Sequence, residues 1–237
     1  MSHFYNSKEE PFLTAANTPS QAKKVDAYPS VTTVMRIIKD PFLDEIWSPK
    51  KYVELARQDE SYTMHDIERL KYGMRVSPVD GSEVTASQFG ISVHNRLEAH
   101  TNDMADNIPL DLSSAWDDWA MPFVDYIKEN NITPVASEFI TWSKELRVAG
   151  SVDFIGKLND GKYFMAEKKD CTQLAIESYM LAKMWNLNYL PEAISVCIDI
   201  VSKKHYNKLW TTKQMEKGIK RFKLATGIYW MDFMNEG

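Results

Sequence analysis

The stretch EFITWSKELRVAGSVDFIGKLNDGKYFMAEKKDCTQ, residues 138–173, contains the pattern on which both the fold and the function depend. Apolar and polar side chains alternate on both sides of Asn159-Asp160-Gly161, as they do in two strands joined by a tight turn. This alternation places Asp153 and Phe154 on opposite faces of the sheet. Three charged residues, Asp153, Glu167 and Lys169, stand where a purely structural strand would place apolar or neutral side chains. The stretch therefore predicts an antiparallel hairpin that carries chemistry as well as core packing.

Two registers are open for this hairpin. If Asp160 and Gly161 form a two-residue turn, Asp153 lies opposite Lys168 and points away from Glu167. If the loop has three residues and Gly161 adopts the left-handed conformation, Asp153 lies directly opposite Glu167. Opposed residues share one face of the sheet, with Cβ atoms about 5 Å apart.

The second register predicts a metal site. Two carboxylates side by side repel each other, and without a counter-charge one of them holds a proton. Hard cations such as Mg²⁺ and Mn²⁺ remove this repulsion, prefer oxygen ligands and bind phosphates. A cation held by Asp153 and Glu167, with Lys169 beside the attacking water, would form a site for cleaving phosphodiester bonds.

Composition narrows the class of protein. The chain has 237 residues with 44% apolar side chains, enough for one large domain or two small ones. Cys171 and Cys197 are too few for a disulfide framework or a cysteine-rich metal site, which favours a reducing compartment. Neither a membrane span nor a signal peptide is visible, so we expect a cytoplasmic protein that is not secreted, in the host cytoplasm if phage-encoded. A net charge of −5 argues against a sequence-independent DNA coat, but not against an enzyme with a local basic groove.

The rest of the chain predicts one α/β domain. Residues 1–27 read as an irregular arm, and residues 28–237 as a single domain without a linker. The expected fold is a central mixed β-sheet of about four strands flanked by helices, with a helical N-terminal elaboration. Residues 28–130 form its mainly helical part and 131–237 the catalytic core. Ser30 as an N-cap and Thr85–Gln88 as a capping box mark the starts of two helices, and residues 76–83 form a loop. The expected strands are 133–142, 145–158, 161–170 and 193–202, and the expected helices near the site are 89–100, 113–129, 172–187 and 212–233.

Several short motifs resemble one nuclease superfamily. Asp153 followed by Glu167-Lys168-Lys169 across a hairpin resembles the D…E-x-K signature of the PD-(D/E)XK nucleases. The segment GISVHNRLE, residues 90–98, is similar to the G-x-x-x-H-x-x-x-E helix of RecB-type members. YPSVTTVM, residues 28–35, resembles the opening of phage exonucleases and of the mitochondrial genome-maintenance exonuclease. The similarity covers roughly residues 28–230 and implies a restriction-endonuclease-like core.

The resemblance implies roles for individual residues. His94, Asp153, Glu167 and the main-chain carbonyl of Lys168 would bind Mg²⁺ or Mn²⁺, and Lys169 would be catalytic together with Asp153 and Glu167. The implied activity is that of a DNA exonuclease acting at free ends, in recombination, repair or degradation of phage or mobile-element DNA. Two alternatives stay open: a structure-specific or restriction-type endonuclease, and an inactive nuclease fold that binds DNA or a partner. A homo-oligomer, or a partner that anneals or binds single strands, is compatible with each activity.

A second group of residues could support the site or contact DNA, and each also has a purely structural interpretation. Glu98 shares a helix face with His94, and Glu138 lies one strand away from Asp153. Gln173 and Tyr179 stand six residues apart, whereas RecB-type members space the corresponding pair by four. Arg147 lies near the start of the expected strand of Asp153 and could contact a phosphate.

Overall fold

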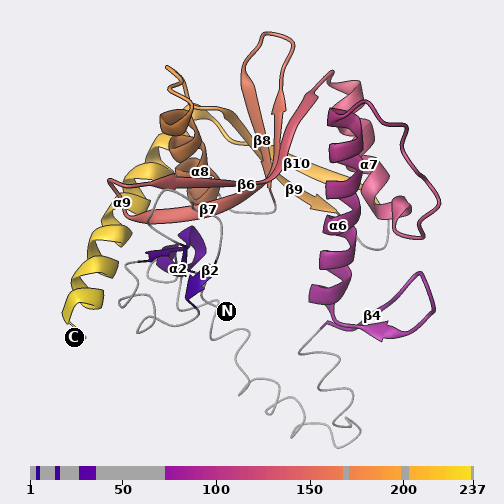
Figure 1. Ribbon diagram of the computed structural model, residues 1–237, viewed down its shortest axis with the longest axis horizontal. Coiled ribbons are helices and arrows are strands. Elements are labelled where there is room, and N and C mark those ends of the chain that lie inside the picture. Colours follow the sequence, from indigo (N-terminus) through magenta and orange to yellow (C-terminus); the bar gives the residue numbers. More distant parts are fainter. Residues whose placement is uncertain are drawn as a thin grey trace, which may run out of the picture.

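A five-stranded mixed sheet flanked by helices forms the centre of the protein (Figure 1). The computed structural model describes residues 4–5, 14–16, 27–35, 73–167, 171–198 and 203–235. The strands follow the spatial order β10-β9-β8-β7-β6, and only the β8–β9 pair is parallel. Their bounds are β6 (Thr133–Ser143), β7 (Val148–Lys157), β8 (Tyr163–Glu167), β9 (Glu192–Ile198) and β10 (His205–Leu209).

The predicted α/β class with a mixed sheet is confirmed, but the expected number of strands was one too small. Strand β10 was missed because its side chains are largely exposed on both faces, as befits an edge strand, so its sequence lacks apolar alternation. Residues 36–72, where further helices are expected, lie outside the described residues, as do Lys168 and Lys169.

The hairpin between β7 and β8 has the three-residue loop. Phe154 pairs with Ala166 and Lys157 with Tyr163, which is the register that sets Asp153 opposite Glu167. The Gly161 amide donates to the Leu158 carbonyl, and Gly161 has a φ of +82°, which an L-residue adopts only under strain. The register required for the predicted site is therefore confirmed.

Helices cover both faces of the sheet. Helices α6 (Ala86–Ala105) and α7 (Asp117–Glu129) lie on one face, where Phe123 and Ile127 pack against Phe154 and Phe164. Helix α8 (Cys171–Met184) lies on the other face and makes the crossover between the parallel strands β8 and β9. Helix α9 (Thr212–Asn235) packs against α8.

The described N-terminal residues dock beside the sheet. Short strands β1 (Phe4–Tyr5), β2 (Thr14–Ala16) and β3 (Tyr28–Pro29) form a small sheet, so residues 1–27 are not irregular throughout. Ser30 accepts a hydrogen bond from the Thr33 amide at the start of α2 (Val31–Met35), which matches its predicted role as a helix cap.

A two-stranded ribbon of β4 (Arg75–Val76) and β5 (Glu83–Val84) precedes α6, where only a loop was expected. No helix within the described parts of the chain combines the length and the apolar character needed to cross a bilayer.

Candidate functional site

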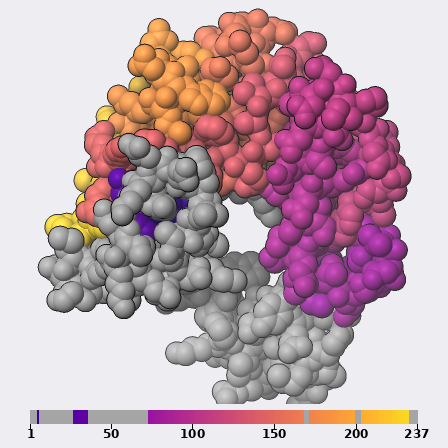
Figure 2. Space-filling view, in the orientation of Figure 1, coloured from indigo at the N-terminus to yellow at the C-terminus, as the bar shows by residue number. Residues whose placement is uncertain are grey.

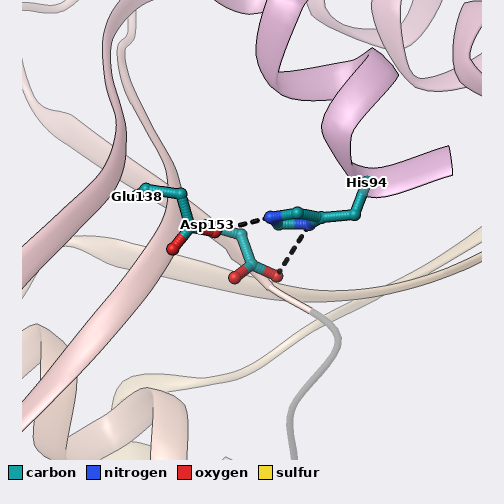
Figure 3. A group of neighbouring side chains, drawn as sticks. All are labelled: His94, Glu138 and Asp153. Carbon is teal, nitrogen blue, oxygen red and sulfur yellow. Dashed lines mark hydrogen bonds and ion pairs between the residues drawn. The ribbon is translucent and has the colours of Figure 1, made fainter. Parts of the chain in front are cut away.

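Three side chains from separate elements converge between α6 and the β6–β7 strands (Figure 3). Nε2 of His94 lies 2.5 Å from Oε1 of Glu138, and Nδ1 of His94 lies 3.8 Å from Oδ2 of Asp153. One ligand-type atom from each residue falls within 4.8 Å of the other two. The side chains are each about one-third exposed: 34% for His94, 39% for Glu138 and 28% for Asp153. A molecule from solution can therefore reach the cluster, and Figure 2 shows the surface hollowed between α6 and the sheet.

Helix α6 holds His94 at a defined height above the strands. Thr85 and Gln88 form the predicted capping box, in which each side chain bonds the other's backbone amide. Phe89 and Val93 are buried on the same helix and anchor it. Capping stops the first turn from unwinding, and His94 lies only two turns further along the helix.

Polar contacts fix α6 to strand β6. The Ser137 hydroxyl lies 2.7 Å from the Thr101 hydroxyl and donates to Oδ1 of Asn102 at 3.1 Å. These bonds lie two turns beyond His94 along α6, while Ser137 is the immediate neighbour of Glu138. The helix therefore touches β6 at two consecutive residues.

Two consecutive residues of a regular strand point to opposite faces, so this part of the sheet is irregular. Val152 and Ile155 both pack in the cluster against α8, although residues three apart normally face opposite sides. Phe154 instead packs against α7, on the face where Asp153 meets His94. The sequence-based expectation that Phe154 and Asp153 face opposite sides is wrong.

The backbone of Glu138 explains this break in the alternation. Ser137 pairs with Phe154 and Phe139 with Val152, so Glu138 lies opposite Asp153. Glu138 has a φ of +48°, in the left-handed region that a residue with a side chain adopts only at a cost. The left-handed backbone at Glu138 brings the side chains of Ser137 and Glu138 to the same face of the sheet. The pairs Ser137–Phe154 and Glu138–Asp153 therefore both lie on the face covered by α6. Strain of this kind gathers at functional sites, where the surrounding structure holds it in place.

The carboxylate of Glu138 is held at both oxygens. Its Oε2 accepts a hydrogen bond of 2.8 Å from the Ser151 hydroxyl, while its Oε1 contacts His94. No pattern in the sequence pointed to Ser151, because a lone serine in a strand is an ordinary surface residue. Glu138 was predicted only as a supporting residue, and the structure brings it to the centre of the cluster.

The carboxylates favour the protonated form of His94. The hydrogen bond to Glu138 raises the pKa of the imidazole above its ordinary value, although partial burial acts in the opposite direction. The negative charges of Asp153 and Glu98 add to the increase. Glu98 therefore acts on His94 through its charge, one helical turn away.

The two nitrogens of His94 face different partners, and this suggests how a cation would fit. When Nε2–H donates to Glu138, the lone pair of Nδ1 is turned toward Asp153. The 3.8 Å gap between Nδ1 and Oδ2 is too long for a hydrogen bond. The two atoms could bind one octahedral ion at about 2.1 Å if they closed to about 3.0 Å, the separation of its neighbouring ligands. In this arrangement Glu138 orients the histidine, as carboxylates commonly do behind metal-binding imidazoles.

Glu167 lies next to this cluster but outside the group of mutually close ligand atoms. It is only 5% exposed, and its Oε2 accepts a 3.0 Å hydrogen bond from the backbone amide of Asp153. Glu167 thus fixes the backbone that carries Asp153. The predicted ligand carbonyl of Lys168 and the predicted catalytic Lys169 follow directly in sequence, but they lie outside the described residues.

The remaining candidates contact other parts of the protein. Gln173 donates to the Thr32 hydroxyl and so links α8 to α2. The Tyr179 hydroxyl donates to Glu145 in the β6–β7 turn, and the Arg147 guanidinium lies 4.1 Å above the Trp230 ring. None of these contacts involves His94, Glu138 or Asp153.

No protein-family model matches this chain, and no curated protein matches it in sequence. The functional interpretation therefore depends on the geometry of the cluster and on the motifs in the sequence.

Proposed function

We propose that this protein is a divalent-metal-dependent deoxyribonuclease with a restriction-endonuclease-like core of the PD-(D/E)XK type, acting as an exonuclease at DNA ends. The observation that carries the proposal is the convergence of His94, Glu138 and Asp153 from one helix and two neighbouring strands. The β7–β8 register supports it, because it sets Glu167 opposite Asp153 at the start of the E-x-K motif.

Each residue has a defined task in this proposal. His94 Nδ1 and Asp153 Oδ2 hold Mg²⁺ or Mn²⁺, while Glu138 fixes the tautomer of the histidine and Glu167 fixes the backbone of Asp153. The bound ion supplies positive charge for the scissile phosphate and lowers the pKa of a bound water. Lys169, carried over from the family motif, is the proposed partner of that water.

The test compares digestion of linear DNA, labelled at either end, with digestion of covalently closed circular DNA in Mg²⁺ and in Mn²⁺. We expect linear DNA to be degraded from its ends and the circle to stay intact. Asp153→Asn and Lys169→Ala should each lower the rate by about a hundredfold or more, because charge stabilisation at the phosphate is lost. Asp125→Asn, at an exposed carboxylate of α7, is the matched control and should leave the rate unchanged.

Glu138→Gln tests the orienting role separately. Loss of such a carboxylate typically weakens metal binding about 10- to 100-fold. Calorimetric titration of Mn²⁺ into the wild type and the variant measures this loss without any nucleic acid. Cleavage of the closed circle would indicate an endonuclease. DNA binding without hydrolysis in either metal, or full activity of Asp153→Asn, would refute the proposed site.

A further inference from the structure

A compact basic and aromatic surface lies away from the candidate site, where the β6–β7 turn meets α8 and α9. Its cations come from the turn, α8 and α9, and three of them lie over two half-buried rings. We refer to it as the turn surface, and it comprises Lys144, Arg147, Lys183, Lys223, Tyr179 and Trp230.

Ring contacts and hydrogen bonds tie most of these residues to the β6–β7 turn, and Lys144 lies in the same turn. Lys223 lies 4.6 Å from the centre of the Tyr179 ring, and Lys183 lies 5.7 Å from the same ring. Arg147 covers the Trp230 ring at 4.1 Å, and the Trp230 indole donates to the Leu146 carbonyl in the turn. Leu146 itself is buried in the core between α2, α8 and α9, which anchors the turn firmly. The surface is therefore built on a rigid support.

The charge of the turn surface is opposite to that of the whole protein. Four cations gather there, and the acidic side chain of Glu145 lies among them, 3.9 Å from Lys223. The chain as a whole carries a net charge of −5. Helix α9, which borders the surface, carries five Lys and Arg residues against two acidic ones. Such a concentration attracts a polyanion that the rest of the protein repels.

The backbone conformation of Arg147 is a second indication that the turn surface has a function. Its φ is +51°, a left-handed turn conformation that Gly or Asn adopts at lower cost. An arginine in this conformation costs conformational free energy that a glycine in the same turn would not. Strained residues of this kind are often found at functional sites. Cations beside aromatic rings are the usual means of binding single-stranded nucleic acid, with phosphates on the cations and bases against the rings.

We propose that the turn surface binds a single strand of DNA that extends from the candidate site. This inference rests on the proposed nuclease function for the identity of the strand. Arg147 stands six residues from Asp153 along β7, about 20 Å at the rise of a strand. A spacing of about 3.4 Å per nucleotide belongs to a stacked helical strand, so roughly six nucleotides is the upper limit for this distance, and an unstacked strand would need fewer. The surface would therefore hold the strand within about six nucleotides of the bond that is cleaved.

Fluorescence anisotropy with 5′-fluorescein-labelled dT20, in EDTA and without metal, measures this binding independently of hydrolysis. The triple variant Lys144→Ala, Arg147→Gly, Lys183→Ala should bind at least about tenfold more weakly. Its slope of log affinity against log salt should fall by roughly 2, because each lost phosphate contact on a single strand contributes about 0.7. The charge-matched control is Lys128→Ala, Lys203→Ala, Lys208→Ala, in which two of the three lysines also lie over tryptophan rings. This control should keep the wild-type affinity and slope.

The single variant Arg147→Gly separates binding from folding. Gly suits a φ of +51°, so this variant should unfold at the wild-type temperature or above it while binding dT20 more weakly. A purely structural arginine would give the opposite result, with lower stability and unchanged binding. In a length series, the difference in affinity between the wild type and the triple variant should reach its full size by about six nucleotides, and a difference that appears only in much longer strands would contradict the spacing.

The two proposals fail in different ways. If the wild type binds dT20 but hydrolyses no DNA in Mn²⁺, the proposed nuclease activity is refuted, whereas the proposed binding of single-stranded DNA by the turn surface is supported. If the triple variant keeps wild-type affinity and salt slope, the turn surface is refuted even though Asp153→Asn abolishes hydrolysis. Equal competition by a 20-base-pair duplex, or by polyglutamate, would refute the assignment to a single strand.

Discussion

Replacing Glu138 by alanine and by glycine should reverse the usual order of stability of these two variants. Both variants lose the same carboxylate and its contacts with His94 and Ser151, so those losses cancel in the comparison. What remains is the backbone, because Ala keeps a Cβ atom at a φ of +48° and Gly does not.

The magnitude follows from two opposing effects. A left-handed conformation costs an L-residue about 1–2 kcal/mol. Gly in a strand is normally less favourable than Ala by roughly 0.5–1 kcal/mol, because it loses more backbone entropy on folding. The difference leaves the Glu138→Gly variant more stable than Glu138→Ala by about 0.5–1 kcal/mol.

Urea unfolding in EDTA, followed by tryptophan fluorescence, measures this difference directly. The matched control is Ile140, which lies on the same strand, pairs regularly with Ser151 and has no positive φ. There the Ala variant should be more stable than the Gly variant by about 0.5–1 kcal/mol. If Ala is also the more stable variant at position 138, the left-handed backbone of Glu138 is not present in solution, and the explanation for the convergence of the site is refuted.

Two further predictions concern titration and packing. The pKa of His94, followed by NMR in EDTA, should lie above its ordinary value of about 6.5 and fall toward it in Glu138→Gln. Because the pKa of His94 is raised on folding, the stabilisation by Glu138 should be fully present below about pH 6.5 and decrease as pH rises through the folded-state pKa. The affinity for Mn²⁺ should increase over the same pH range, because the imidazole loses its proton. A stability difference between the wild type and Glu138→Gln that grows with pH would contradict the raised pKa. Gly156→Ala should destabilise the protein by about 1–3 kcal/mol in urea unfolding, since an added Cβ would lie 2.3 Å from Cγ2 of Ile132. Gly90→Ala, where an added Cβ meets nothing within 4 Å, should instead stabilise α6 by about 0.5–1 kcal/mol, and equal effects at the two glycines would contradict the packing argument.

The sequence contained the local information for much of this structure. Thr85 and Gln88 predicted the start of α6, and the Asn159–Gly161 loop offered the register that the structure adopts. Both features depend on residues within a few positions of one another. Such signals can be read from a single chain, because capping and turn geometry are local.

The centre of the candidate site depends on contacts that no local pattern contains. Glu138 lies 44 residues from His94, and its left-handed backbone is not a conformation that glutamate favours. Strand alternation predicted opposite faces for Asp153 and Phe154, because the period of two assumes a regular strand. A reversal imposed by the neighbouring strand is a tertiary effect, so only the folded structure could locate it.

The order of the elements along the chain also has a consequence for how the site is assembled during folding. Glu138, Asp153 and Glu167 all belong to the β6–β7–β8 meander, which closes through short loops. Contacts of short sequence separation form early, because closing a short loop costs little chain entropy. We expect His94 to join later, because α6 docks across a longer sequence separation. In a refolding experiment, Glu138, Asp153 and Glu167 should therefore come together before His94 reaches them. If the cluster binds a cation as proposed, tight binding should appear only with the docking of α6.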